Sequence, residues 1–268
     1  MRKSIFDIEI RINILDEFKK IVDITCTPDT VKYERKTYSY IEFIDKFVFN
    51  EWKYRGTCLE SWEYFNSIGI DEQCFKLGII DEINFLYYLE FLLNMNLLIH
   101  NQYPLYSVEI LSKKLSSIFN HNIDIILEKM NYKAIKDGDK IIIVKRDADV
   151  DSIVELVPEN IGMLLLEYND IRNNDIESKE SILKKIDKYI EKDKNKYKQN
   201  CSRVYEASQT IVNNFDVNHL NKKVNVNKDE LKNLYDKCFR LYIHLIRNAE
   251  VQKITSDMEA LKQELLIK

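Results

Sequence analysis

Glycine and proline are scarce in this chain, whose 268 residues include 5 glycines and 3 prolines. Glycine adopts the positive φ angles of tight turns without steric cost, and proline fixes the geometry of others. A chain with so few of either can form few tight turns, so we expect long helices joined by a small number of loops. The same scarcity excludes sites built on glycine-rich phosphate loops or dinucleotide fingerprints.

Apolar residues recur at helical spacing along most of the chain. For residues 6–14 a strand is also possible, because apolar and polar residues alternate there, but a helix over 8–22 is favoured. Thr57 and Glu60 have the spacing of a capping box, and Pro158 suits the first position of a helix. The predicted helices cover residues 8–22, 39–48, 58–68, a short segment from 71, 81–100, 107–119, 124–130 and 161–168, followed by two long ones at 175–213 and 229–266.

The two long helices are separated by a polar, asparagine-rich stretch, which is typical of a helical hairpin that needs a partner surface. The only predicted β element is a hairpin near residues 132–145, where Asp137 and Gly138 separate two β-prone runs. The expected fold class is therefore mainly α: a multi-helix bundle with a small β-hairpin and a long C-terminal helical hairpin. We divide the chain into helical regions at 1–103 and 104–268, or treat it as one domain.

Composition limits the cellular location and the binding partners that we expect for the protein. A hydrophobic fraction of 45% predicts a folded chain, and a net charge of −4 gives an average surface that does not attract nucleic acid or anionic membranes. The most apolar stretch, residues 83–99, is shorter than the roughly 20 residues of a membrane span and contains Glu90, Asn94 and Asn96. No signal peptide is evident, so we expect a soluble, cytoplasmic protein without a membrane segment.

Neither metal nor cofactor is expected. The five cysteines form no C-x-x-C pair and the four histidines no H-x-x-x-H pair, although zinc sites usually show such spacings. The cysteines are predicted to be reduced thiols, mostly in the core.

The candidate catalytic residues lie on the last helix. Arg240, His244 and Arg247 follow each other at spacings of four and three, which puts them on one helix face. Imidazole and guanidinium groups are the minimum needed for RNA cleavage without a metal, because His can transfer the proton and Arg can stabilise the charged phosphorane. Alternatively, the arginines only pair with Asp236, Glu250 or another helix.

Two further segments are candidates. His219 lies in the polar stretch between the long helices, either as a second catalytic candidate or in a solvated turn. A locally basic segment with nearby tyrosines could hold phosphates and stack bases, or be a solvated helix face. Its candidate nucleic-acid-binding residues are Lys194, Lys196, Lys198 and Arg203.

Several segments resemble bacterial proteins associated with abortive infection. They are residues 127–132 (LEKMNY), 141–147 (IIIVKRD), 165–169 (LLEYN), 175–179 (DIESK) and 52–57 (WKYRGT). The resemblance implies a C-terminal region like a HEPN domain, a helical bundle often used as an RNA endonuclease through an Arg, a short spacer and a His. The resembling proteins have an Arg-His pair where this chain has Asn218 and His219. Because this Arg is missing here, Arg240 and His244 become the candidate pair instead. Their spacer is one residue shorter than the HEPN pattern.

Two functions therefore remain in competition. The first is a phage-defence protein of abortive-infection type that acts as a metal-independent endoribonuclease, with His244 as acid or base and Arg240 and Arg247 on the phosphate. The second is a non-enzymatic sensor, inhibitor or scaffold. The interaction protein is expected to bind another protein, or a second copy through the long helices. The endoribonuclease is expected to bind RNA.

Overall fold

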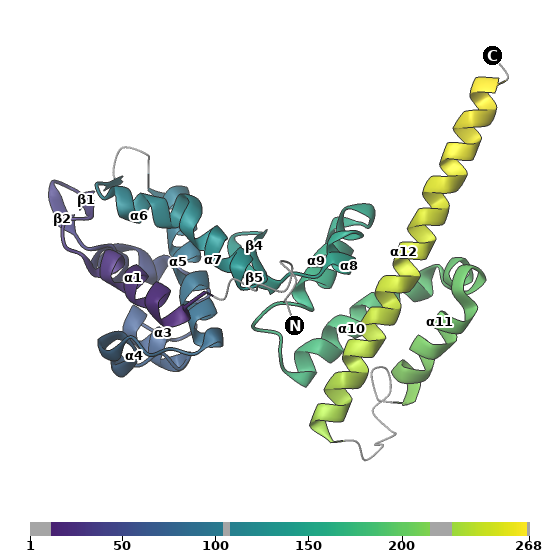
Figure 1. Ribbon diagram of the computed structural model, residues 1–268, viewed down its shortest axis with the longest axis horizontal. Coiled ribbons are helices and arrows are strands. Elements are labelled where there is room, and N and C mark those ends of the chain that lie inside the picture. Colours follow the sequence, from purple (N-terminus) through teal and green to yellow (C-terminus); the bar gives the residue numbers. More distant parts are fainter. Residues whose placement is uncertain (1–11, 104–107, 215–226, 267–268) are drawn as a thin grey trace, which may run out of the picture. The chain divides into compact units, whose positions relative to one another are not determined.

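The computed structural model describes residues 12–103, 108–214 and 227–266, and it is mainly helical, as predicted (Figure 1). The chain forms two compact units, residues 1–145 and 146–268. This division falls after the β-hairpin, whereas the predicted boundary lies near residue 103. The hairpin belongs with the first unit because it packs on that unit's long apolar helix.

The first unit is built around α5 (Glu82–Gln102), whose side chains are largely buried. Aromatic rings on the surrounding elements pack on this helix, as in the contacts of Phe18 with Tyr88 and of Phe65 with Phe91. The other helices of the unit are α1 (Ile14–Cys26), α2 (Tyr40–Phe43), which continues through a π-turn (Ile44–Val48) and a 3-10 turn (Phe49–Glu51), α3 (Ser61–Ser67), α4 (Glu72–Leu77), α6 (Lys113–Ser117), a second π-turn (Ile118–Asn122) and α7 (Ile123–Lys129).

The N-terminal helix begins later than predicted. Asn13 caps α1, and its side-chain oxygen accepts a hydrogen bond from the backbone N–H of Asp16. Most of the region where a strand or an earlier helix start was considered lies outside the described residues.

A small sheet in the first unit was not predicted. Its strands are β1 (Val31–Tyr33), β2 (Lys36–Tyr38) and β3 (Val108–Ile110), in the order β2-β1-β3 with antiparallel pairing. Three-residue strands are too short to show alternation, and β3 pairs with a segment about 75 residues earlier in the sequence. The helix predicted for 107–119 is therefore wrong at its start: β3 comes first, and α6 begins after the cap Ser112.

The predicted capping box at Thr57 is also wrong. Helix α3 begins at Ser61, and its N-cap residue Glu60 makes no side-chain capping bond. The N–H of Ser61 is instead satisfied by the Asp45 carboxylate, 3.1 Å away in the π-turn after α2. A partner from another element thus replaced the local cap that the sequence pattern indicated.

The β-hairpin is confirmed. Strands β4 (Tyr132–Asp137) and β5 (Lys140–Lys145) pair antiparallel, and Gly138 has φ +60° in the turn. Two polar side chains of α5 bind the free edge of β5: Asn94 donates to the Ile141 carbonyl at 2.7 Å and accepts from its N–H at 2.8 Å, and Glu90 accepts from the Ile143 N–H at 3.0 Å. These bonds explain why Glu90 and Asn94 interrupt the most apolar stretch of the sequence.

The second unit is built mainly of helices in its described part. It contains α8 (Ala148–Asp151), a 3-10 turn (Val154–Leu156), α9 (Glu159–Glu167), α10 (Ile176–Lys192), α11 (Lys194–Asn214) and α12 (Lys228–Leu266). The single helix expected over 175–213 is divided at Asp193, and Cys201 interrupts α11 with non-helical φ and ψ angles. Pro158 is the N-cap of α9, one position before the predicted one.

The long helix α12 packs against both α10 and α11, so the predicted hairpin is part of a three-helix arrangement. Its core includes Ile186 of α10, Val212 of α11 and Tyr242 of α12. Among the cysteines only Cys238 is buried, and burial raises its thiol pKa to about 12. Cys26 is exposed and the other three are half-buried, so the prediction of mostly core thiols was wrong. Within the described ranges, no helix is long and apolar enough to span a membrane.

Candidate functional site on helix α12

Helix α12 has two parts with different surroundings. In the first part, up to Glu250, one side of the helix is buried in the core of the second unit through Tyr235, Phe239, Tyr242 and Ile246. In the second part, every residue from 251 to 263 is exposed. In Figure 1 this distal part extends beyond the ends of α10 and α11.

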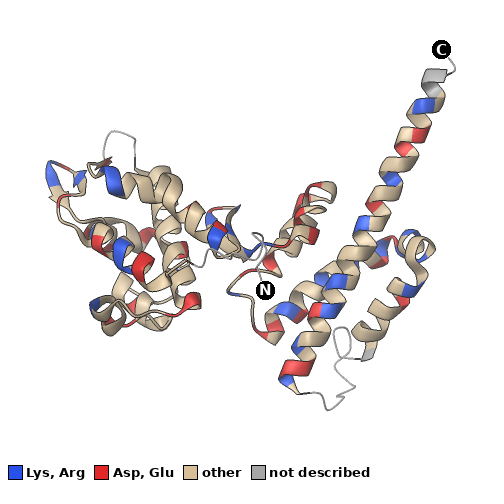
Figure 2. Cartoon of the chain, in the orientation of Figure 1, with Lys and Arg blue, Asp and Glu red and all other residues tan. Residues whose placement is uncertain are grey.

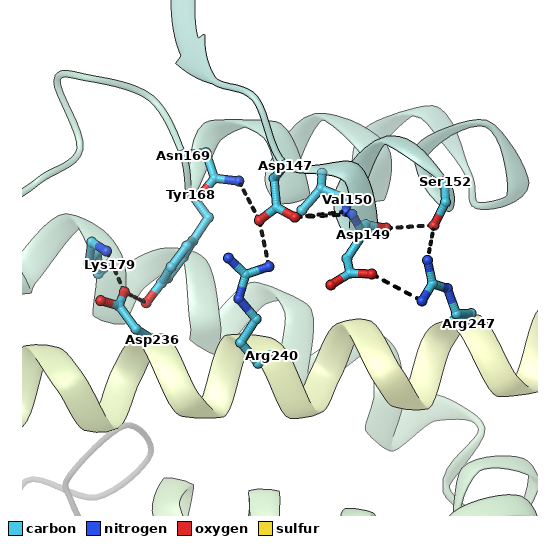
Figure 3. A network of polar contacts seen from close by, with 10 residues as sticks. All are labelled: Asp147, Asp149, Val150, Ser152, Tyr168, Asn169, Lys179, Asp236, Arg240 and Arg247. Carbon is cyan, nitrogen blue, oxygen red and sulfur yellow. Dashed lines mark hydrogen bonds and ion pairs between the residues drawn. The ribbon is translucent and has the colours of Figure 1, made fainter. Parts of the chain in front are cut away.

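Arg240, His244 and Arg247 share the side of α12 that faces α8. The guanidinium group of Arg240 lies 2.6 Å from the carboxylate of Asp147 (Figure 3). The Asp147 side chain is only 9% exposed, and it also caps α8 by accepting hydrogen bonds from the N–H groups of Asp149 and Val150. Arg240 is therefore the counter-ion of a nearly buried capping carboxylate.

Arg247 makes a second set of contacts with the same segment. Its guanidinium group lies 3.0 Å from the Asp149 carboxylate and donates to the Ser152 hydroxyl at 2.6 Å (Figure 3). The two arginines thus pair with another element, as one of the alternatives predicted, although with Asp147 and Asp149 instead of Asp236 and Glu250.

Asp236 belongs to a third contact, one turn earlier on α12. It accepts hydrogen bonds from Lys179 of α10 at 2.5 Å and from the Tyr168 hydroxyl at 2.9 Å (Figure 3). The Tyr168 ring stacks on Phe239 with centroids 3.8 Å apart, and burial, followed by the Asp236 charge, raises the pKa of its hydroxyl. Together these three contacts tie α8, α9 and α10 to one side of α12.

His244 is exposed between the two arginines, and it has no hydrogen bond or ion pair to any residue that the structure describes. Its imidazole is open to solvent. A phosphate bound next to it would have to compete with Asp147 and Asp149 for the guanidinium groups. The geometry therefore leaves the His244 imidazole accessible, whereas Arg240 and Arg247 beside it are both paired with carboxylates. His219 lies outside the described residues.

The predicted basic segment is partly neutralised. Lys196 pairs with Glu250 at 3.0 Å, and Lys194 lies 3.8 Å from Glu191 and over the Tyr205 ring. Lys198 and Arg203 are exposed. Acidic and basic residues are also interspersed along α12 (Figure 2).

The distal part of α12 carries four apolar side chains on one side: Val251, Ile254, Met258 and Leu261, which are 45–66% exposed. We call them the distal stripe. Their spacings of three, four and three repeat every 3.5 residues on average, as in the contact seam of a left-handed coiled coil. These residues were predicted to lie on the apolar face of the last helix, but the sequence does not show whether the fold covers that face.

No family model, curated protein or solved structure matches the chain. Within the described ranges, no group of three or more His, Cys, Asp or Glu side chains is placed to hold a metal ion. The candidate site is therefore interpreted from its own geometry.

Proposed function

We propose that this chain is an interaction protein that binds an apolar helix of a protein partner through the distal stripe of α12. The observation that carries the proposal is the exposure of Val251, Ile254, Met258 and Leu261 along one side of α12, where no described residue covers them. This is the second of the two functions considered from the sequence.

Two physical arguments support a helical partner. Fully burying a side chain such as Val, Ile, Met or Leu is worth about 1.5–3 kcal/mol, so a partner that covers the stripe gains several such contributions. Isolated helices shorter than about 12–15 residues are marginal in water, and every residue from 251 to 263 of α12 is exposed. A second helix at coiled-coil spacing would both cover the stripe and stabilise the helix that carries it.

The test is position-specific crosslinking in cells that express the full chain. A photoreactive amino acid replaces Met258 in one variant and Ser256, on the opposite side of α12, in the other. We expect a discrete adduct from position 258 alone, and loss of that adduct when Ile254→Lys is added. Adducts from both positions, or from neither, would contradict the proposal.

A metal-independent endoribonuclease activity is the second candidate, favoured by the exposed, unpaired imidazole of His244 between two arginines. The pairing of both arginines with carboxylates counts against it. If the activity exists, purified protein cleaves RNA in EDTA, and His244→Ala abolishes cleavage while His100→Ala, at an exposed position of the first unit, does not. Cleavage that persists in both His244→Ala and His219→Ala would eliminate this candidate.

Under either candidate, the proposed setting is defence against phage. This setting rests on the resemblance of residues 52–57 and of segments between 127 and 179 to abortive-infection proteins. The matching segments lie outside α12, so the interaction proposal does not depend on the resemblance.

A further inference from the structure

We infer that the partner of the distal stripe is a second copy of this chain, paired in parallel and in register as a two-stranded coiled coil. The inference rests on the proposed function and adds the identity and orientation of the partner. It is carried by the charged residues on both sides of the stripe.

The heptad positions follow from the stripe itself. In a heptad whose seven positions are labelled a to g, Val251 and Met258 occupy position a, and Ile254 and Leu261 occupy position d. The g position on one flank is then Asp257, and the e positions on the other flank are Thr255 and Lys262. Glu250, at the preceding g position, is paired with Lys196 of the same chain.

This charge pattern distinguishes the two orientations. In a parallel pair, a g residue faces the e residue five positions later on the other helix, so Asp257 of each copy faces Lys262 of its partner, giving two opposite-charge contacts. In an antiparallel pair that brings Val251 of one copy opposite Leu261 of the other, g faces g, so the two Asp257 carboxylates would face and repel each other. Asp257 and Lys262 are exposed, and neither has an ion partner among the described residues.

The N-terminal end of the seam is set by contacts within one chain. Going toward the N-terminus, the next d and a positions are Arg247 and His244. Arg247 is held by Asp149 and Ser152 of the same chain, so α8 lies over this part of the helix face. The seam therefore begins at Val251 and extends about 24 Å to residue 266, at 1.5 Å per residue. Because the seam is this short, we expect a concentration-dependent equilibrium between monomer and dimer.

Association is tested by sedimentation equilibrium of the purified full chain, and orientation by charge exchange. An exposed ion pair contributes about 1 kcal/mol at most. Lys262→Glu replaces two such pairs of the dimer by like charges, so it is expected to raise the dissociation constant about tenfold. The double variant Asp257→Lys/Lys262→Glu restores opposite charges across a parallel seam and should return the constant to near the wild-type value. A chain that remains monomeric at all concentrations, or forms trimers, overturns the inference.

Disulfide formation provides an independent measure of register. Leu261→Cys should form a homodimeric disulfide under mild oxidation, whereas Ser256→Cys, on the outer side, and the wild-type chain should not. A disulfide that forms only when Leu261→Cys is mixed with Val251→Cys would instead indicate antiparallel pairing and overturn the inference. A monomeric chain whose position-258 adduct in cells contains a different protein would refute self-pairing and leave the proposed function standing.

Discussion

Asp147 and Asp149 offer a direct test of what the arginines of α12 do. The two carboxylates are two residues apart, and each pairs with an arginine of α12, Arg240 and Arg247 respectively. They differ in surroundings: the Asp147 side chain is 9% exposed and caps α8, whereas that of Asp149 is 53% exposed. If the contact with Arg240 anchors the fold, Asp147→Ala should destabilise the second unit far more than Asp149→Ala.

The expected magnitudes follow from these contacts. Loss of an N-cap side chain costs about 1 kcal/mol, in a range of about 0.5–2. Loss of the Arg240 pair adds about 0.5–1 kcal/mol, because Arg240 is half-exposed and can be resolvated by water. Asp147→Ala should therefore lower the free energy of unfolding by roughly 1–3 kcal/mol. Asp149→Ala should lower it by about 0–1 kcal/mol, as for an exposed ion pair.

Hydrogen exchange read by mass spectrometry is the suitable assay because it resolves the two units. Peptides that cover residues 148–157 should exchange about tenfold faster or more in Asp147→Ala, since about 1.4 kcal/mol corresponds to a factor of ten. Peptides of β4 and β5 should be unchanged in both variants. Equal effects of the two substitutions, or no effect of Asp147→Ala, would refute the view that the Arg240 contact is a structural anchor.

Two further predictions concern the first unit. Asn94→Ala removes both hydrogen bonds to Ile141 and leaves two part-buried backbone groups unpaired, so it should cost about 2–4 kcal/mol in urea unfolding. The control is Asn96→Ala, which removes a buried side-chain oxygen that has no hydrogen-bond partner and should cost clearly less. Equal costs of the two substitutions would contradict this reasoning. The Asp139 carboxyl, whose pKa is lowered from 3.8 to about 2 chiefly by a hydrogen bond from Lys53, stabilises the hairpin above its unfolded pKa, and that contribution is lost as the pH falls through about 2. An NMR titration should show this midpoint, and Lys53→Ala should raise it toward 3.8; an unchanged midpoint would exclude Lys53 as the cause.

Local sequence signals predicted most of the helices and the hairpin, because these elements depend on contacts between near neighbours. The Asp137–Gly138 turn is an example, since it needs only a glycine that accepts positive φ. The three-stranded sheet, the start of α3 and the break at Asp193 were missed because each depends on residues distant in sequence or on a geometry without a local pattern. Asp45, for example, satisfies the first amide of α3 from 16 residues away.

For the candidate site, the sequence by itself determined that Arg240, His244 and Arg247 share one side of a long helix, and that apolar residues continue along it to Leu261. Only the tertiary structure decided what that side contacts: carboxylates of α8 pair with the arginines, and no described residue covers the distal stripe. The physical reason is that helical periodicity fixes which residues share a face, whereas burial and ion pairing depend on the elements that pack against that face.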